Sequence, residues 1–258
     1  MKRTSILNQY KGICSDILSE MTTKLRKSFK TLFMETLILY MVIPGRINFL
    51  QLGRYGRSCE QRFRQNFSKD FDWLEFNLKL SDKVLTGKRK AIAVDPSFIS
   101  KSGKVTPWIG YFWSGCAGTT KRGLEILGVG LIDIDTKDCI SLQAVQTPDT
   151  KTLENRDATL IDWYLLVLNS MKDELVKASS YVVADAYFAK NNFVTGLQQM
   201  NFELISRLRD DAALFYPTLE KPSGKKGRPR IYDGRIDFNN LDTSRVQKIS
   251  SDNNQGEL

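Results

Sequence analysis

The chain has 258 residues, enough for one large domain or two modest ones, and its 41% hydrophobic content and mean hydropathy of −0.31 exclude an intrinsically disordered protein. It contains no histidine, which excludes Ser-His-Asp and Cys-His nucleophile chemistry and leaves hydrolysis to carboxylates and a hard cation. The formal net charge of +9 indicates polyanionic partners.

The positive charge is concentrated in the N-terminal third. Residues 1–90 hold 18 Lys and Arg against 8 Asp and Glu, whereas residues 91–258 hold 20 against 21. Charge alone also fits an ordinary solvated helical surface. An asymmetry of this size nevertheless favours a nucleic-acid-binding region joined to a neutral domain with another task.

Residues 5–43 are expected to be helical throughout, because apolar side chains recur at steps of three and four residues. Pro44 and Gly45 end this segment. Its most apolar run, residues 37–43, is far shorter than the roughly 20 residues of a membrane helix, and no signal peptide is evident. We therefore expect a cytoplasmic, nucleoid-associated protein that does not enter a membrane.

A second helical region is expected from residue 46 to about residue 85. Within it, residues 53–56 predict a turn, and Ser58 with Gln61 predicts a capping box for the next helix. Helix, glycine turn and a capped helix rich in Arg and Gln is the outline of a helix-turn-helix, although an ordinary helical hairpin fits the same pattern. Residues 1–86 are thus predicted to form a basic, all-helical DNA-binding domain.

From residue 90 onward the pattern changes to strands and helices in alternation. Strands are expected at 91–94, 108–113, 125–133 and 140–145, then a helix at 153–177, a strand at 181–184, a helix at 190–200 and a strand at 202–206. This order predicts an α/β layered domain over residues 90–215. Residues 216–258 are polar, with a basic Pro- and Gly-rich run at 221–230, and are expected to form a linker.

The cysteines give no sign of a metal centre. Cys14, Cys59, Cys116 and Cys139 lie far apart without a C-x-x-C pairing, which argues against zinc. We expect them to be small buried side chains in a reducing compartment.

Two aspartates stand in the same local context. Asp95 and Asp185 each come directly after a short apolar strand. Side chains at the carboxyl ends of neighbouring strands in an α/β sheet converge on one crevice, so the two carboxylates are predicted to share divalent cations if their strands are adjacent. Two metals would clamp the attacking and leaving oxygens of a phosphodiester. An aspartate after a strand is also a common turn former or helix cap, and the pattern alone leaves both interpretations open.

Around these aspartates the sequence resembles the bacterial insertion-sequence transposases of the DDE type. The matching stretches are residues 91–95 with Ser97, Lys101 and Ser102, and residues 121–126, 182–188 and 205–209. The resemblance covers roughly residues 40–240, and the segment around Asp185 is its most specific part. It implies an RNase H-like catalytic core, which is incomplete in this chain, preceded by the helical DNA-binding domain.

The resemblance also implies an activity. Asp95 and Asp185 would be the first two members of a catalytic triad that binds Mg²⁺ or Mn²⁺, and the enzyme would hydrolyse the ends of the element and join the freed 3′-OH to target DNA. The third member in such transposases is a Glu in a Tyr-x-x-Arg-x-x-x-Glu context, and nothing of that form follows Asp185. We therefore expect a chain cut short before or within an insertion, with doubtful activity.

Double-stranded DNA, as terminal repeats and target, is the expected partner, and homo-oligomer formation on DNA stays open. Lys226-Gly-Arg-Pro-Arg230 resembles an AT-hook core, whose arginines fit a narrow A·T minor groove, although a solvated basic linker has the same composition. For Arg207 and Arg209, phosphate contact and a plain surface position are both open. The predicted DNA-binding residues are Arg54, Arg57, Gln61, Arg62, Arg64, Lys88, Arg89, Lys90, Lys121, Arg207, Arg209, Arg228 and Arg230.

Two other functions remain open. A non-catalytic DNA-binding protein derived from a transposase could recognise terminal repeats and repress the full-length enzyme, and the absence of the third Glu favours it. Another RNase H-like nuclease, acting on RNA–DNA hybrids or junctions, is the third interpretation. The large basic helical region argues against that one.

Overall fold

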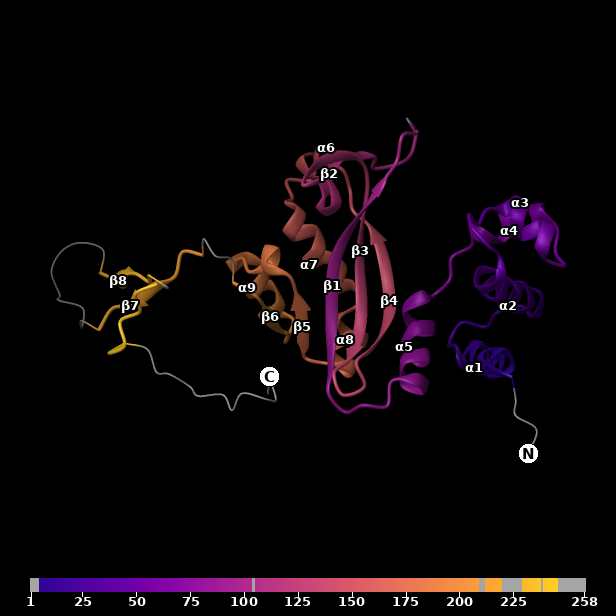
Figure 1. Cartoon of the computed structure of the whole chain (residues 1–258), viewed down its shortest axis with the longest axis horizontal. Coiled ribbons are helices and arrows are strands. Elements are labelled where there is room, and N and C mark those ends of the chain that lie inside the picture. Colours follow the sequence, from indigo (N-terminus) through magenta and orange to yellow (C-terminus); the bar gives the residue numbers. More distant parts are fainter. Residues whose placement is uncertain (1–4, 104, 209–211, 220–228, 238, 246–258) are drawn as a thin grey trace. The chain divides into compact units, whose positions relative to one another are not determined.

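The computed structural model of the protein describes residues 5–103, 105–208, 212–219, 229–237 and 239–245. The chain divides into two compact units, Met1–Arg207 and Leu208–Leu258. The first holds the N-terminal helices and the main sheet (Figure 1). Within the described residues no helix is both long and apolar enough to span a membrane.

The N-terminal region is helical, as expected from its composition, but it is more divided. Its helices are α1 (Ile6–Glu20), α2 (Lys27–Val42), α3 (Phe49–Tyr55), α4 (Glu60–Phe67) and α5 (Trp73–Val84). The single helix predicted for residues 5–43 is wrong: α1 ends at Glu20, where the Met21 cap turns to extended backbone. The break lets α1 and α2 fold against each other, so Cys14 and Ile17 share a buried cluster with Phe33 of α2.

The main sheet combines antiparallel and parallel strands. Its strands are β1 (Lys90–Ser100), β2 (Gly110–Ser114), β3 (Thr119–Asp133), β4 (Asp138–Gln146), β5 (Tyr181–Ala184) and β6 (Glu203–Ser206). Pairing follows the order β2-β3-β1-β5-β6, and β4 also pairs with β3. β3 pairs antiparallel with β1, β2 and β4, whereas β5 pairs in parallel with β1 and β6 pairs in parallel with β5. Figure 1 shows β1, β3 and β4 as the long strands of the sheet.

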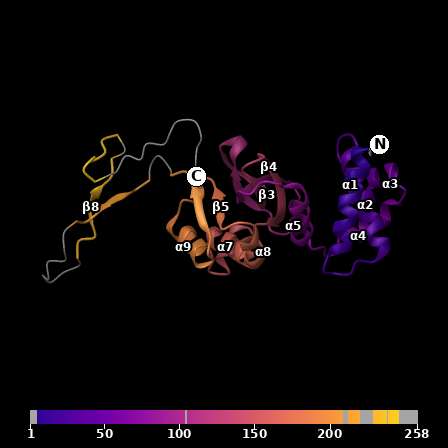
Figure 2. The same cartoon turned by 90° about the horizontal axis from the view of Figure 1, so that it is seen from below.

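Helices connect the parallel strands and cover one face of the sheet. The predicted helix at 153–177 is divided into α6 (Thr150–Glu154), α7 (Leu160–Ser170) and α8 (Lys172–Ala178), and α9 (Asn191–Gln199) follows β5. α7 begins at a capping box in which Thr159 and Asp162 satisfy each other's backbone amides. The main core joins α7, α8 and α9 to β1, β3 and β5, and Figure 2 shows these helices grouped together. Short 3₁₀ turns, η1 (Gly115–Ala117) and η2 (Ala186–Phe188), follow β2 and β5.

α5 links the helical region to the sheet. Phe76 on α5 belongs to the core of α1 and α2, whereas Leu74 and Leu78 pack against the core of the sheet. The side-chain amide of Asn77 donates to the Leu142 carbonyl on β4 at 2.9 Å. The two regions are therefore in contact through one helix.

The second unit contains more structure than the predicted linker. β7 (Phe215–Pro217) and β8 (Tyr232–Arg235) form an antiparallel pair. Asp233 on β8 accepts from the Arg245 guanidinium at 2.9 Å. The expectation that all four cysteines are buried is also wrong, because only Cys14 is buried and Cys59, Cys116 and Cys139 are exposed.

Candidate functional site

The two aspartates lie next to each other on neighbouring strands. Val94 of β1 pairs in parallel with Ala184 of β5, so the residues that follow them, Asp95 and Asp185, occupy adjacent positions. The backbone at Asp185 is still extended, with φ −71° and ψ 175°, so alternation of side chains carries through both positions. Both carboxylates therefore project to the same face, on strands about 4.8 Å apart. Both side chains are exposed.

The predicted end of the first strand is wrong. Residues 91–94 were expected to stop at Asp95, yet β1 continues to Ser100 because β3 pairs with it along the whole length, from Lys90↔Asp133 to Ser100↔Gly123. β5 pairs only with residues 92–94, so among the described residues one edge of β1 has no strand beside it from Asp95 onward. Pro96, which has no N–H, is tolerated at such an edge. Asp95 thus lies inside a strand, at the point where its parallel neighbour ends.

The two carboxylates differ in their hydrogen bonds. Asp185 Oδ1 accepts from the backbone N–H of Tyr187 at 3.0 Å, and the Ser206 hydroxyl donates to the Asp185 carbonyl at 2.8 Å. These bonds fix both the turn and the side chain at Asp185. Among the described residues the Asp95 carboxylate accepts no hydrogen bond and forms no ion pair. Partial burial, and then the negative charge of Asp185, raise the pKa of Asp95 above its usual value.

This donor set fits a divalent cation. Two exposed carboxylates that repel each other, one of them without a donor or cation partner, are relieved when a positive ion binds between them. Mg²⁺ is commonly held by one or two carboxylates together with phosphate oxygens. Within the described residues no cluster of three or more His, Cys, Asp or Glu side chains could hold a metal. Asp95 and Asp185 therefore offer an open site that water and phosphate would complete.

A buried acid close to this site was not predicted from the sequence. Glu125 on β3 is 6% exposed, and its Oε1 accepts from the hydroxyl of the fully buried Tyr164 on α7 at 2.6 Å. Burial raises the pKa of Glu125, and the hydrogen bond from Tyr164 offsets part of that effect. The Tyr164 ring packs 5.5 Å from that of Phe188, in the turn after Asp185. Tyr164 therefore connects β3 to the turn that carries the second aspartate.

The helical hairpin of α3 and α4 is built around close backbone contact. A Cβ at Gly53 would lie 2.7 Å from the backbone nitrogen of Glu60, so only glycine lets the two helices approach this closely. Gly53 lies inside α3 rather than in the predicted turn, which begins at Gly56. The hairpin matches the order of a helix-turn-helix, and an ordinary helical hairpin has the same order.

The predicted capping role of Ser58 is also wrong. Its hydroxyl donates to Glu35 Oε2 on α2 at 2.7 Å, and its backbone N–H donates to Glu35 Oε1 at 2.9 Å. Cys59 is the N-cap of α4 and makes no side-chain capping bond. Although burial raises the pKa of Glu35, the hydrogen bonds from Ser58 and Arg57 hold it below its usual value. Glu35 therefore pins the turn between α3 and α4 to α2.

The residues predicted to bind DNA are not gathered in one place. Arg54, Arg57 and Gln61 are exposed on the α3–α4 hairpin, and no side-chain partner is found for them within the described part of the chain. On the same hairpin Arg62 donates to the Ser28 carbonyl, and Arg64 pairs with Glu60 and lies over the Phe49 ring.

The other predicted DNA-binding residues lie on the sheet unit or beyond it. Lys88 and Lys90 flank Arg89, which is paired with Asp135 at 2.7 Å, while Lys121 on β3 and Arg207 after β6 are exposed. Arg230 belongs to the second unit, where it pairs with Asp233 at 3.5 Å. Arg209 and Arg228 lie outside the described residues, as does most of the AT-hook-like segment.

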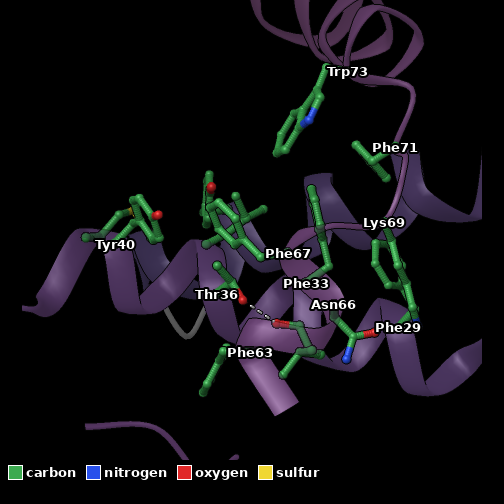
Figure 3. A pocket seen from close by; sticks show the side chains of 14 residues that line it. Phe29, Phe33, Thr36, Tyr40, Phe63, Asn66, Phe67, Lys69, Phe71 and Trp73 are labelled. Atoms are coloured by element: carbon green, nitrogen blue, oxygen red, sulfur yellow. Dashed lines mark hydrogen bonds between the residues drawn. The ribbon is translucent and has the colours of Figure 1, made fainter. Parts of the chain in front are cut away.

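An apolar cavity of about 540 Å³ lies among the N-terminal helices (Figure 3). Aromatic side chains from α1, α2, α4, the start of α5 and the segment before it line it, including Phe33, Phe63 and Trp73. None of its lining residues comes from the strands that carry the aspartates. The cavity is therefore separate from the candidate metal site.

Comparison with known protein families places the chain in one of them. A family described as DDE superfamily endonuclease matches residues 50–255, which is most of the chain and includes both aspartates. No curated protein matches the chain.

Proposed function

Because the chain belongs to the DDE superfamily endonucleases, we propose that it is a DNA transposase whose Asp95 and Asp185 hold the divalent cations used for strand cleavage and strand transfer. Enzymes of this kind act on DNA and typically use divalent metal ions. The observation that carries the proposal is the parallel pairing of Val94 with Ala184, which makes the two aspartates neighbours on one face. The RNase H-like core implied by the resemblance is supported by the mixed sheet and its helical connections.

The residues of this chain would perform distinct parts of the reaction. Asp95 and Asp185 would bind Mg²⁺ or Mn²⁺, which would activate the attacking oxygen and stabilise charge on the phosphate. The hydrogen bonds from Tyr187 and Ser206 would keep Asp185 in place while substrate binds. Because the two carboxylates leave coordination positions open, a phosphate oxygen could enter the metal shell directly. A third acidic ligand is not part of the described cluster.

The basic helical region would hold the DNA. Arg54 and Arg57 lie exposed beside the α3–α4 hairpin, where their guanidinium groups are available to phosphates. This arrangement also supports the second candidate function, a DNA-binding protein that represses without cutting, because that function needs the hairpin and not the metal. The two functions differ in whether metal binding matters.

Metal binding tests the proposal directly. Isothermal titration calorimetry with MnCl₂ should show that the wild type binds Mn²⁺. Asp95→Asn and Asp185→Asn should each bind Mn²⁺ at least about tenfold more weakly, because each change removes one ligand of a small set. Asp173→Asn, at an exposed position on α8, is the matched control and should bind as the wild type does. Equal Mn²⁺ affinity in all four proteins would refute a shared site.

Plasmid nicking then separates the two functions. A transposase should nick supercoiled DNA with Mn²⁺, and Asp95→Asn should abolish nicking while leaving DNA affinity nearly unchanged. Metal binding without nicking by the wild type would instead favour the repressor.

A further inference from the structure

Two large aromatic side chains stand uncovered on the hairpin formed by β2 and the start of β3, residues 110–123, here called the aromatic ribbon. Tyr111 is 69% exposed and Trp113 is 61% exposed. Neither ring contacts another aromatic ring within the described part of the chain. Phe112, between them, is buried, so the two rings project to the opposite side of the strand.

The aromatic ribbon shares a face with the aspartates. Tyr111 pairs with Arg122 on β3, and Asp95 pairs with Gly128 on the same strand, six residues further along. Residues directly opposite each other point to one side, and an even separation along a strand preserves that side. No register shift interrupts β3 between these two pairs. The rings therefore lie on the Asp95 face, about 20 Å along the strand from the candidate metal site.

The surroundings of the rings suit a polyanion. Between Asp95 and Glu125 the sequence contains four basic residues and no acidic one. Arg122, directly across from Tyr111, donates to the carbonyls of Ser102 and Gly103 at 3.2 Å each, which holds its guanidinium at that segment. Lys101, next to the residues that Arg122 contacts, is exposed. Lys121 lies opposite the buried Phe112 and projects to the other side of the strand. An apolar protein partner would gain little from these charges, whereas a nucleic-acid backbone would be attracted by them.

The spacing of the rings suits unpaired bases. Alternate residues of a strand are about 7 Å apart, which leaves room for one flat ring at about 3.4 Å from each aromatic face. Bases within a duplex are already stacked on their neighbours, so only unpaired bases expose both faces to such a platform.

We propose that Tyr111 and Trp113 form a stacking platform for unpaired bases of the DNA strand that reaches the Asp95–Asp185 site. The choice of DNA as the ligand rests on the proposed function. The exposure of the two rings and the basic residues near them are observations independent of that function. The platform gives the chain a way to hold a strand whose duplex has been opened near the point of cleavage.

Binding of labelled DNA by the full chain in EDTA tests the platform without any metal chemistry. A fluorescein-labelled single strand of mixed sequence should bind the wild type, with about a tenfold loss of affinity in Trp113→Ala and in Tyr111→Ala, because one stacked base is lost in each. Trp113→Phe keeps an aromatic face and should recover most of the affinity. Tyr181→Ala, which removes an aromatic that is 50% exposed on β5, is the matched control and should bind as the wild type does.

Several outcomes would overturn the platform. The first is a wild type that does not bind the single strand, and the second is an affinity that is unchanged in both alanine variants. The third is an equal loss of affinity in these variants for a duplex of the same sequence. A wild type that self-associates in sedimentation, and no longer does so after Trp113→Ala, would show that the ribbon binds a second copy instead. Because EDTA removes the metal, this test is independent of Mn²⁺ binding at Asp95. Loss of the platform with intact Mn²⁺ binding, and loss of Mn²⁺ binding with an intact platform, are therefore separate results.

Discussion

At the scale of single residues, Glu125 is an acid placed where charge is unfavourable. Its carboxyl group is buried, it accepts a hydrogen bond from the neutral hydroxyl of Tyr164, and it forms no ion pair with any described residue. Burial is the main reason that its pKa is raised. The folded state therefore holds the Glu125 proton more tightly than the unfolded state does, and folding stability must depend on pH.

Replacing Glu125 with Gln should reveal this dependence. Glutamine keeps an acceptor for Tyr164 and cannot ionise. A raised pKa in the folded state lowers stability as pH rises above the ordinary value of about 4.3, so Glu125→Gln should be more stable than the wild type at pH 8 and nearly equal to it at pH 5. Urea midpoints at the two pH values measure the difference.

Tyr164→Phe is the comparison variant. It removes the donor but leaves the acid, so it should be less stable than the wild type, and the deficit should grow as pH rises. A constant gap between Glu125→Gln and the wild type across this range would contradict the ionisation of a buried carboxyl group.

The two aspartates could be noticed in the sequence because each follows a short apolar run, although only the family resemblance singled them out as a pair. Glu125 could not be predicted in the same way. Its strand alternates apolar and other residues, and the alternation places Glu125 in line with the buried Leu127 and Val129, but its partner Tyr164 lies 39 residues away. Only the folded sheet shows that the two side chains meet.

At the scale of elements, the α3–α4 hairpin depends on the absence of a side chain at Gly53. The Cβ of an alanine at Gly53 would come within 2.7 Å of backbone at the start of α4, which cannot move without shifting the helix. We expect Gly53→Ala to lower the free energy of unfolding by about 1–3 kcal/mol, as overpacking does elsewhere.

Gly12 is the matched control because it also lies within a helix, and a Cβ there would meet nothing within 4 Å. Gly12→Ala should raise stability by about 0.5–1 kcal/mol, since alanine has less backbone freedom to lose. Thermal or urea unfolding gives both values. A stabilising Gly53→Ala would show that the two helices are not held this close.

The positions of most elements followed from periodicity, but their ends often did not. The helix predicted over 5–43 breaks at Met21 because packing α1 against α2 buries more apolar surface than one long helix would. Ser58 matches the capping pattern, yet its hydroxyl donates a hydrogen bond to the Glu35 carboxylate on α2 instead of capping α4. Such tertiary partners override local signals and are not visible in a short window of sequence.

At the scale of the whole molecule, the uneven charge makes the proposed binding of duplex DNA testable. If the basic N-terminal third neutralises phosphates, affinity should fall steeply with salt, by a factor on the order of 10³ or more between 50 and 200 mM for six to ten contacts. Fluorescence anisotropy with a duplex measures the slope of log affinity against log salt concentration.

Charge removal on the hairpin should flatten that slope. The double change Arg54→Ala and Arg57→Ala should reduce it by about two, because each lost phosphate contact removes about one unit. Lys151→Ala, an exposed change on α6 outside the basic third, should leave it unaltered. A wild-type affinity that is insensitive to salt would count against duplex binding by this region.

The α/β class and the order of its elements were predictable because strand and helix periods differ clearly along residues 90–206. The paired strands of the second unit were not, since β7 and β8 are short and the polar segment between them carries no apolar pattern. The sheet order also required the structure, because β5 joins the sheet beside β1 rather than beside β4, its predecessor in the chain.

The pairing of β5 with β1 affects when Asp95 and Asp185 come together during folding. β1 and β5 touch over only three register positions, and 90 residues separate the two aspartates. Closing so long a loop costs chain entropy before the contacts between the two strands can offset that cost, so nonlocal parallel pairing of this kind is slow. The antiparallel hairpin of β3 and β4 can form much sooner. During synthesis and refolding, therefore, the strand bearing Asp95 would exist for some time without its counterpart, and the proposed cation site would be completed among the last features of the fold.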